Sequence, residues 1–276
     1  MSRLVNLHTH TSFCDGENTP AEMAKAAYKN GFKCLGFSGH APMSIRNSYC
    51  MSSENLQAYR SEVVKLKHLY KDKMDIFLGL EADYFSDSFE FKDYDYIIGS
   101  VHHVCYNDFY LCIDSSPIDL VIAINVYKNN INSLIYDYYK QVADIPNRFK
   151  ADIIGHFDII AKYNLSNKFF DENDSFYQKC ALGALESVVD KGLYLEINTG
   201  AVNKPGVCRI FPSKFILKYA NKIGAKIVIS SDSHAEKTLN MGFESAVSLA
   251  KECGYKTAYK LSEAGFCEFD LNDLIK

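Results

Sequence analysis

Short apolar runs alternate with longer segments of helical periodicity along the 276-residue chain. The runs have the length of buried strands, and most of the segments between them carry apolar residues at helical spacing. Strands that alternate with helices are typical of βαβ units, so the pattern predicts an α/β protein with a parallel sheet. The expected strands are residues 4–8, 33–38, 76–81, 94–101, 153–155, 193–198 and 226–230.

Local signals indicate where several helices begin and end. Thr19-Pro20-Ala21-Glu22 has the form of a capping box with proline at the first helical position, and this helix should stop at Gly31. We expect Ser53 to cap a long second helix and Pro212 to begin a later one. The other expected helices lie near residues 119–142, 175–191 and 243–253.

We predict a single domain over residues 1–276, because no Gly/Pro/Ser-rich linker and no break in composition divides the chain. Seven expected strands favour an irregular α/β barrel over the regular eight-fold form. No GxGxxG or GxxxxGK[ST] motif follows any expected strand, which argues against dinucleotide or P-loop chemistry.

Composition and charge narrow the classes of partner. With 47% hydrophobic and 23% charged residues, the chain is typical of a globular protein. A net charge of -4 without a basic run argues against a long nucleic acid but allows a small phosphorylated substrate. Neither a signal-peptide core nor an apolar stretch of membrane-spanning length is present, and the nine cysteines show no zinc-type spacing. We therefore expect a cytoplasmic protein with reduced thiols and no membrane partner; the sequence predicts no oligomeric state.

Histidine and carboxylate side chains follow six of the seven expected strands. Two clusters, Leu7-His8-Thr9-His10 and Ser231-Asp232-Ser233-His234, pair such side chains at a spacing of two, which places both on one face of a strand. The carboxyl ends of barrel strands face a common mouth, so these groups should converge there. The candidate ligands are His8, His10, Asp15, His40, Glu81, His102, His156, Asp232 and His234.

Nine side chains exceed the four ligands of a single tetrahedral zinc. Two or three divalent ions, with Glu81 shared between two of them, fit the number better. Imidazole and carboxylate without thiolate suit zinc, manganese or iron. We favour His102 over its neighbour His103, which should point to the opposite face of the strand.

The segments that carry these candidate ligands resemble the polymerase-and-histidinol-phosphatase (PHP) superfamily, and most closely its stand-alone histidinol-phosphate phosphatases. The resemblance implies a distorted (β/α)7 barrel, similar to a TIM barrel. It implies one ion held by His8, His10, Glu81 and Asp232, a second by Glu81, His102 and His156, and a third by Asp15, His40 and His234. The matching segments are His8-Thr9-His10 with Cys14-Asp15-Gly16, Gly36-Phe37-Ser38-Gly39-His40-Ala41-Pro42, Gly79-Leu80-Glu81, Gly99-Ser100-Val101-His102, Gly155-His156-Phe157-Asp158, Glu196-Ile197-Asn198-Thr199 and Ser231-Asp232-Ser233-His234.

The resemblance also implies a reaction, the hydrolysis of L-histidinol phosphate in histidine biosynthesis. Metal-activated hydroxide would attack phosphorus, with Glu81 shared between the ions and Asp232 or His234 delivering a proton to the leaving alkoxide. Glu196 and Asn198 either bind the cationic groups of the substrate or satisfy backbone groups. The expected contacts to the substrate phosphate are Arg209 and Lys204 in one loop, Lys162, and Arg46.

Two other functions are open to the same residues. A phosphodiesterase or nuclease acting on a small nucleotide would use the same metal site. A longer strand would need a basic or stacking groove, and the net charge of -4 without a basic run argues against one. A metal-bearing but inactive module that scaffolds a partner would be expected to lack ligands, and none of the nine is missing.

Overall fold

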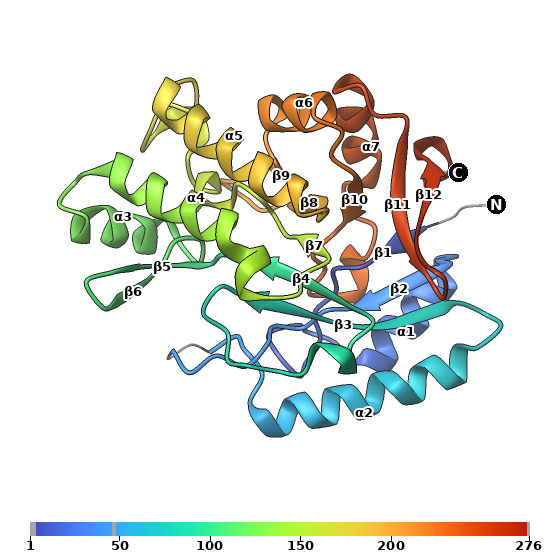
Figure 1. The fold of residues 1–276 in the computed structure, drawn as a ribbon. Coiled ribbons are helices and arrows are strands. Elements are labelled where there is room, and N and C mark those ends of the chain that lie inside the picture. The colour runs from blue at the N-terminus through green and yellow to red at the C-terminus, as the bar shows by residue number, and fades with distance from the viewer. Residues whose placement is uncertain (1–3, 46–47, 275–276) are drawn as a thin grey trace.

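A curled, seven-stranded parallel sheet forms the centre of the computed structural model, which describes residues 4–45 and 48–274 (Figure 1). All seven expected strands are confirmed, and the sheet order is β1-β2-β3-β4-β7-β8-β10. With helices around its outside, the sheet is the distorted (β/α)7 barrel predicted from the resemblance. The strands are β1 (Val5–Asn6), β2 (Cys34–Phe37), β3 (Asp75–Asp83), β4 (Tyr96–Ser100), β7 (Ile153–Ile154), β8 (Tyr194–Ala201) and β10 (Ile227–Ser230).

The first and last strands of the sheet meet only beyond their carboxyl ends. Thr9 and Ser233 form an isolated parallel bridge. The backbone N–H of His10 donates to the carbonyl of Ser233 (2.8 Å), and the N–H of Ser233 donates to the carbonyl of His8 (3.1 Å). The barrel is therefore closed by two segments that together carry four of the nine predicted ligands.

The helices largely follow the sequence signals. Helix α1 (Pro20–Lys29) begins with the predicted capping box: Thr19 accepts from the backbone N–H of Glu22, and Glu22 accepts from that of Thr19 (2.8 Å). It ends before Gly31, whose φ of 82° is the left-handed conformation that glycine adopts without strain. The other helices are α2 (Ser53–Tyr70), α3 (Pro117–Val126), α4 (Ile131–Arg148), α5 (Ser175–Asp190), α6 (Lys214–Lys222) and α7 (Phe243–Glu252).

Two predicted helix starts were wrong by one or two residues. Ser52, not Ser53, caps α2, because it has extended backbone and accepts from the N–H of Asn55 (3.1 Å). Pro212 follows a cis peptide bond and lies outside α6, whose N-cap is Ser213. The single helical region expected near residues 119–142 is two helices, separated at Lys128 and Asn129, where φ is positive.

Several elements of the fold were not expected from the sequence. One hairpin, β5 (His103–Tyr106) and β6 (Phe109–Cys112), follows β4, and a second, β11 (Thr257–Ser262) and β12 (Gly265–Asp270), follows α7. Strand β9 (Arg209–Phe211) pairs antiparallel with β8. No α-helix joins β3 to β4, where residues 91–93 form only a short 3-10 turn. Within the described residues, none of the helices combines the length and apolar character needed to cross a bilayer.

A tyrosine fills the barrel where two strands carry glycine. The Tyr96 hydroxyl donates to the carbonyls of Leu7 (2.5 Å) and Phe37 (3.1 Å), and the side chain is buried. A Cβ atom at Gly36 would lie 2.3 Å from the Tyr96 hydroxyl oxygen, and one at Gly79 would lie 2.3 Å from Tyr96 Cζ. Glycine is required at both positions because the ring occupies the space of a side chain.

Gly79→Ala is therefore expected to lower the free energy of unfolding by about 3 kcal/mol, since a rigid, buried ring would have to move. Gly183→Ala is the matched control: this glycine is exposed on α5 with open space at its Cβ position. Alanine there should stabilise the protein by about 0.5 to 1 kcal/mol. Urea denaturation of both variants tests the pair, and equal midpoints would contradict the packing described for Tyr96.

Candidate metal centre

The structure brings the nine predicted ligands together at the carboxyl ends of the barrel strands. His8 and His10 follow β1, His40 follows β2, and Glu81 lies within β3. The remaining strand ends supply His102 after β4, His156 after β7, and Asp232 with His234 after β10, while Asp15 comes from the loop after β1. Parallel strands explain the convergence, because their carboxyl ends share one edge of the sheet.

The first group of ligand atoms surrounds the point where β1 and β10 meet. His8 Nε2 lies 3.3 Å from Glu81 Oε2 and 3.6 Å from Asp232 Oδ1. His10 Nε2 lies 3.5 Å and 3.1 Å from the same two oxygen atoms. Two imidazoles and two carboxylates thus face one another, which matches the first ligand set implied by the resemblance.

The second group gathers around Glu81. Its Oε1 lies 3.0 Å from His156 Nε2 and 3.6 Å from His102 Nε2, and it accepts from Ser100 Oγ (2.7 Å). His40 Nδ1 approaches the other oxygen, Oε2, at 2.9 Å. Glu81 therefore lies between two sets of imidazoles, as a shared ligand would. His40, expected only in the third set, also lies with Glu81 and His102.

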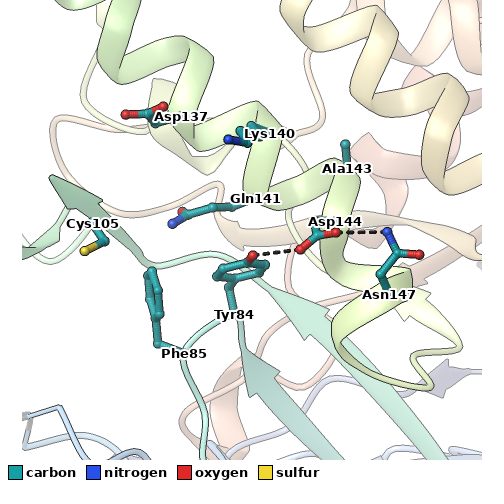
Figure 2. Close-up of a pocket in the computed structure, with 9 residues that line it drawn as sticks. All are labelled: Tyr84, Phe85, Cys105, Asp137, Lys140, Gln141, Ala143, Asp144 and Asn147. Atoms are coloured by element: carbon teal, nitrogen blue, oxygen red, sulfur yellow. Dashed lines mark hydrogen bonds between the residues drawn. The ribbon is translucent and has the colours of Figure 1, made fainter. Parts of the chain in front are cut away.

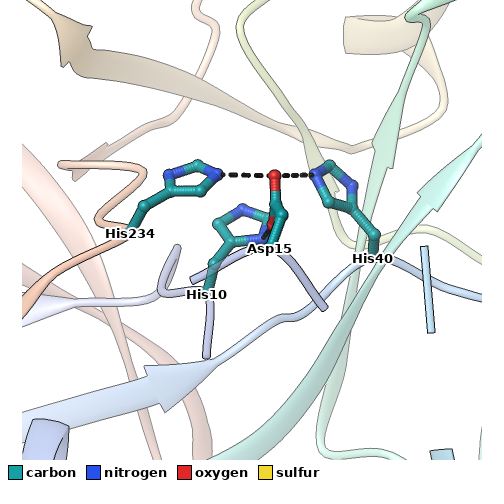
Figure 3. A group of neighbouring side chains, drawn as sticks. All are labelled: His10, Asp15, His40 and His234. Carbon is teal, nitrogen blue, oxygen red and sulfur yellow. Dashed lines mark hydrogen bonds and ion pairs between the residues drawn. The ribbon is translucent and has the colours of Figure 1, made fainter. Parts of the chain in front are cut away.

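The third group consists of His10, Asp15, His40 and His234, whose side chains lie close together (Figure 3). Asp15 Oδ2 is 3.2 Å from His234 Nε2 and 3.8 Å from His40 Nε2, and Asp15 Oδ1 is 3.4 Å from His10 Nδ1. The side chains of Asp15 and His234 are 30% and 32% exposed, whereas that of His10 is fully buried. Solvent therefore reaches the cluster from this side.

His156 Nδ1 is buried without a hydrogen bond, and so are three ligand atoms that face one another: His8 Nε2, His10 Nε2 and Glu81 Oε2. Buried polar atoms are nearly always hydrogen-bonded, so an orphaned group calls for an ion or a water. These three atoms point to the same place, and their chemistry suits a divalent cation of the zinc, manganese or iron type. The residues present therefore fit divalent metal ions.

Charge compensation within the cluster shifts the pKa values of its members. Burial alone would raise the pKa of Glu81, but the surrounding imidazoles, led by His40 and His8, hold it well below its usual range. Burial alone would lower the pKa of His8, but Glu196, Asp232 and Glu81 raise it well above its usual range. A metal ion takes the place of protons on such imidazoles, so ion binding should release protons.

Two buried carboxylates contact the Nδ1 atoms of His8 and His102, whose Nε2 atoms face the other ligands. Glu196 Oε1 lies 2.7 Å from His8 Nδ1, and its Oε2 accepts from the backbone N–H of His156 (2.8 Å). Asp83 Oδ2 lies 3.2 Å from His102 Nδ1 and accepts from the backbone N–H of the same residue (2.7 Å). Such contacts fix the tautomer and orientation of a ligating histidine. Asp83 was not predicted, although its position two residues after Glu81 on one strand was a usable signal.

Glu196 is fully buried and lies against His8. The structure therefore favours a role in satisfying groups of the protein itself over a role in binding the cationic groups of the substrate. Asn198 lies beside it, donating to Glu196 Oε2 (3.0 Å) and to Asp232 Oδ2 (3.3 Å). His103 belongs to none of the groups of ligand atoms; its Nδ1 lies 3.3 Å from the Tyr49 hydroxyl and 3.9 Å from Asp83 Oδ2. These three residues therefore support or border the centre.

Glu196→Gln is expected to lower zinc affinity and kcat/KM by about 10- to 100-fold, because an amide holds the His8 ring less firmly than a carboxylate. Zinc titration and phosphate release measure the two effects. The control is Glu263→Gln, which changes an exposed glutamate far from any predicted ligand in sequence. Unchanged zinc affinity in Glu196→Gln would show that the carboxylate only fills space.

A cavity of about 240 Å³ opens onto the predicted ligands. Lys162 and Lys204 line it, as expected of groups that contact a phosphate. Tyr49 and Asp114 also line it and were missed, because neither follows a strand of the barrel. The other lining residues are Asp15, His40, Ser48, Glu81, His102, Cys112, Ser115, Ile159, Asp232 and His234.

Two arginines, Arg209 and Arg46, were also predicted to contact the phosphate. Arg209 does not line this cavity: its Nη1 donates to Glu172 Oε1 (2.8 Å) and to the carbonyl of Ala161 (3.1 Å), and Nη2 donates to Glu172 Oε2 (2.5 Å). A guanidinium held by both carboxylate oxygens is occupied, so the structure corrects the prediction of a phosphate contact. Arg46 lies outside the described residues.

A larger cavity, of about 530 Å³, lies beside α4 and the segment that follows β3 (Figure 2). The Tyr84 hydroxyl donates to Asp144 Oδ2 (2.8 Å), and Asn147 donates to Asp144 Oδ1 (2.9 Å). Phe85 and Cys105 form part of the wall. None of the nine predicted ligands lines this cavity, so it is separate from the cluster.

Comparison with known proteins gives consistent matches. The model of the PHP domain family matches residues 6–200. A Deinococcus radiodurans protein named "Probable histidinol-phosphatase" is 30% identical over 267 residues, which cover 93% of this chain and 96% of that protein. The histidinol-phosphatase of Bacillus subtilis is 26% identical, with coverage of 86% and 96%.

Among solved structures, the histidinol phosphate phosphatase of Lactococcus lactis subsp. lactis Il1403, complexed with Zn, L-histidinol and phosphate, has the same fold. It matches with a TM-score of 0.72 and 21% identity, over 96% of this chain and 99% of that one.

Proposed function

The chain belongs to the PHP domain family, and from this premise we infer that it is a phosphoric monoester hydrolase that converts L-histidinol phosphate into L-histidinol and inorganic phosphate. The carrying observation is the convergence of nine imidazoles and carboxylates at the carboxyl ends of the strands, six of which line one cavity together with two lysines. Histidinol-phosphatases resemble the chain along nearly its whole length, and one relative was crystallised with L-histidinol and phosphate.

Divalent ions bound at the cluster would supply Lewis acidity, which lowers the pKa of water and draws charge from the phosphoryl oxygens. The residues of the chain supply the rest. Lys162 and Lys204, which line the cavity, would pair with the phosphate oxygens as negative charge develops on them. Asp232 and His234 line the same cavity, and one of them would pass a proton to the leaving alkoxide.

The proposal includes two or three ions of zinc, manganese or iron. Support for more than one comes from the three groups of ligand atoms, which are too spread for a single tetrahedral ion. Support for zinc comes from the Lactococcus lactis relative. The reaction would place the chain in histidine biosynthesis.

Phosphate release from three substrates tests the proposal. L-histidinol phosphate should be hydrolysed with a kcat/KM at least about 100-fold above that for p-nitrophenyl phosphate, because the cavity recognises the amino alcohol as well as the phosphate. Hydrolysis of bis(p-nitrophenyl) phosphate should be weaker still. Preference for the bis ester would favour a phosphodiesterase, and metal-loaded protein without turnover on any of the three would favour the inactive scaffold.

A further inference from the structure

We propose that Asp114 is a specificity-determining residue, which binds the protonated amine of the substrate while its partner Lys162 binds the phosphate. The inference deepens the proposed function and rests on it. It concerns a carboxylate that the metal centre does not use.

Asp114 differs from the other carboxylates that line the cavity. Among the described residues, these are Asp15, Glu81 and Asp232, and all three belong to the groups of ligand atoms described above. Asp114 belongs to none of those groups. Its Oδ2 instead accepts a hydrogen bond from Lys162 Nζ (3.0 Å), and its side chain is only 13% exposed.

The backbone around Asp114 is fixed. It lies between β6 and α3, where the N–H of Ile113 donates to the carbonyl of His102 (3.0 Å). The hydroxyl of Tyr163 donates to the carbonyl of Ser115 (2.7 Å). The neighbours on both sides of Asp114 are therefore tied to segments that border the metal centre, which holds the carboxylate at the cavity wall.

The negative charge of Asp114 is the reason to expect that it distinguishes between substrates. A fixed carboxylate in a cavity that receives a phosphate repels the substrate, and the repulsion is stronger where water is largely excluded. Lys162 offsets this repulsion but has only one positive charge to share between Asp114 and the phosphate. Burial would raise the pKa of Asp114, yet Lys162 and His102 hold it below its usual range, so the group is charged. A substrate with its own cation beside the phosphate removes the conflict, and one without it does not.

L-histidinol phosphate has such a cation in the right place. Its amine is on the carbon next to the CH2 group that carries the phosphate ester, so the ammonium cannot lie far from the ester oxygen. With the phosphate between the ions and Lys162, the ammonium must fall in the same cavity of about 240 Å³. Asp114, in contact with Lys162, is the carboxylate available to receive it there.

The first test needs no variant. The protein should hydrolyse L-histidinol phosphate with a kcat/KM at least about 10-fold above that for 3-(imidazol-4-yl)propyl phosphate, which differs only in lacking the amine. L-Histidinol should likewise inhibit hydrolysis of p-nitrophenyl phosphate more strongly than the alcohol without the amine. Equal values for both pairs would overturn the assignment.

The second test is Asp114→Asn, which keeps the size of the side chain but removes its charge. The preference for the amine-bearing substrate, taken as the ratio of the two kcat/KM values, should fall by about 10-fold or more, mainly through KM. Asp108→Asn is the matched control, because Asp108 is exposed at the tip of the β5–β6 hairpin with φ of 66°, where asparagine is tolerated.

The ratio of the kcat/KM values for the substrates with and without the amine distinguishes amine binding by Asp114 from a role only in positioning Lys162. If Asp114 only orients Lys162, the variant should lose activity equally on both substrates and the ratio should stay constant, which would overturn the proposal. If the wild type hydrolyses p-nitrophenyl phosphate but not L-histidinol phosphate, the proposed function itself fails and this inference fails with it.

Discussion

Replacing Glu81 with glutamine is expected to lower kcat/KM for phosphate release by more than about 100-fold, above the usual effect of residues that only support a ligand. Both oxygens of Glu81 are used: Oε2 faces His8 and His40, and Oε1 faces His156. An amide has nearly the same shape but lacks the negative charge and offers one acceptor in place of two. Ions on both sides of this position should therefore bind more weakly.

The experiment combines phosphate release with elemental analysis of the purified variant. Glu90→Gln serves as its control, because that side chain is 74% exposed on the loop between β3 and β4 and should change neither activity nor metal content. Circular dichroism shows whether the barrel forms. A folded Glu81→Gln variant with full activity and full metal content would refute the role of Glu81 as a shared ligand.

Removing the divalent ions with a chelator is expected to abolish phosphate release and to lower the Tm by about 10 °C. The loss of activity follows from the loss of the Lewis acid. The loss of stability follows because ions that bind only the folded chain stabilise it by about 4 kcal/mol when present at 1,000 times their Kd. In a chain of this size, that free energy corresponds to a shift of roughly this extent.

Adding back zinc, manganese and iron separately should restore both the activity and the Tm, and the ion that restores most activity identifies the preferred metal. Magnesium is a useful control, because it prefers an octahedron of oxygen ligands to an imidazole-rich site. Full activity in the presence of excess chelator would contradict the metal-dependent mechanism.

The barrel strands and the predicted ligands could be found in the sequence because both depend on local order. A strand buried on both faces appears as a continuous apolar run, and the direction of the strand places the residues at or just beyond its carboxyl end at the mouth. Glu81 and His156 could be identified in this way without knowledge of their neighbours. The two short hairpins and β9 carry no comparable signal, because the hairpins form separate sheets and β9 is a three-residue antiparallel strand beside β8.

Roles that depend on partners distant in sequence could not be assigned from the chain alone. Arg209 seemed suited to a phosphate by its residue type, but Glu172, 37 residues away, takes up its guanidinium. Asp83 and Glu196 gain their roles from the imidazoles that the fold places against them. Asp114 is notable only because Lys162 and the cavity are beside it.

The bridge between Thr9 and Ser233 also affects the order of events during synthesis. Residues 8 and 10 leave the ribosome well before Asp232 and His234, which lie more than 220 residues further along the chain, and domains fold only as their parts emerge. A nascent chain that ends before residue 232 has imidazoles from the early strands but no final carboxylate to complete their set. Capture of the full set of ions should therefore wait until Asp232 and His234 have been made, and a product truncated before them should be metal-poor as well as inactive.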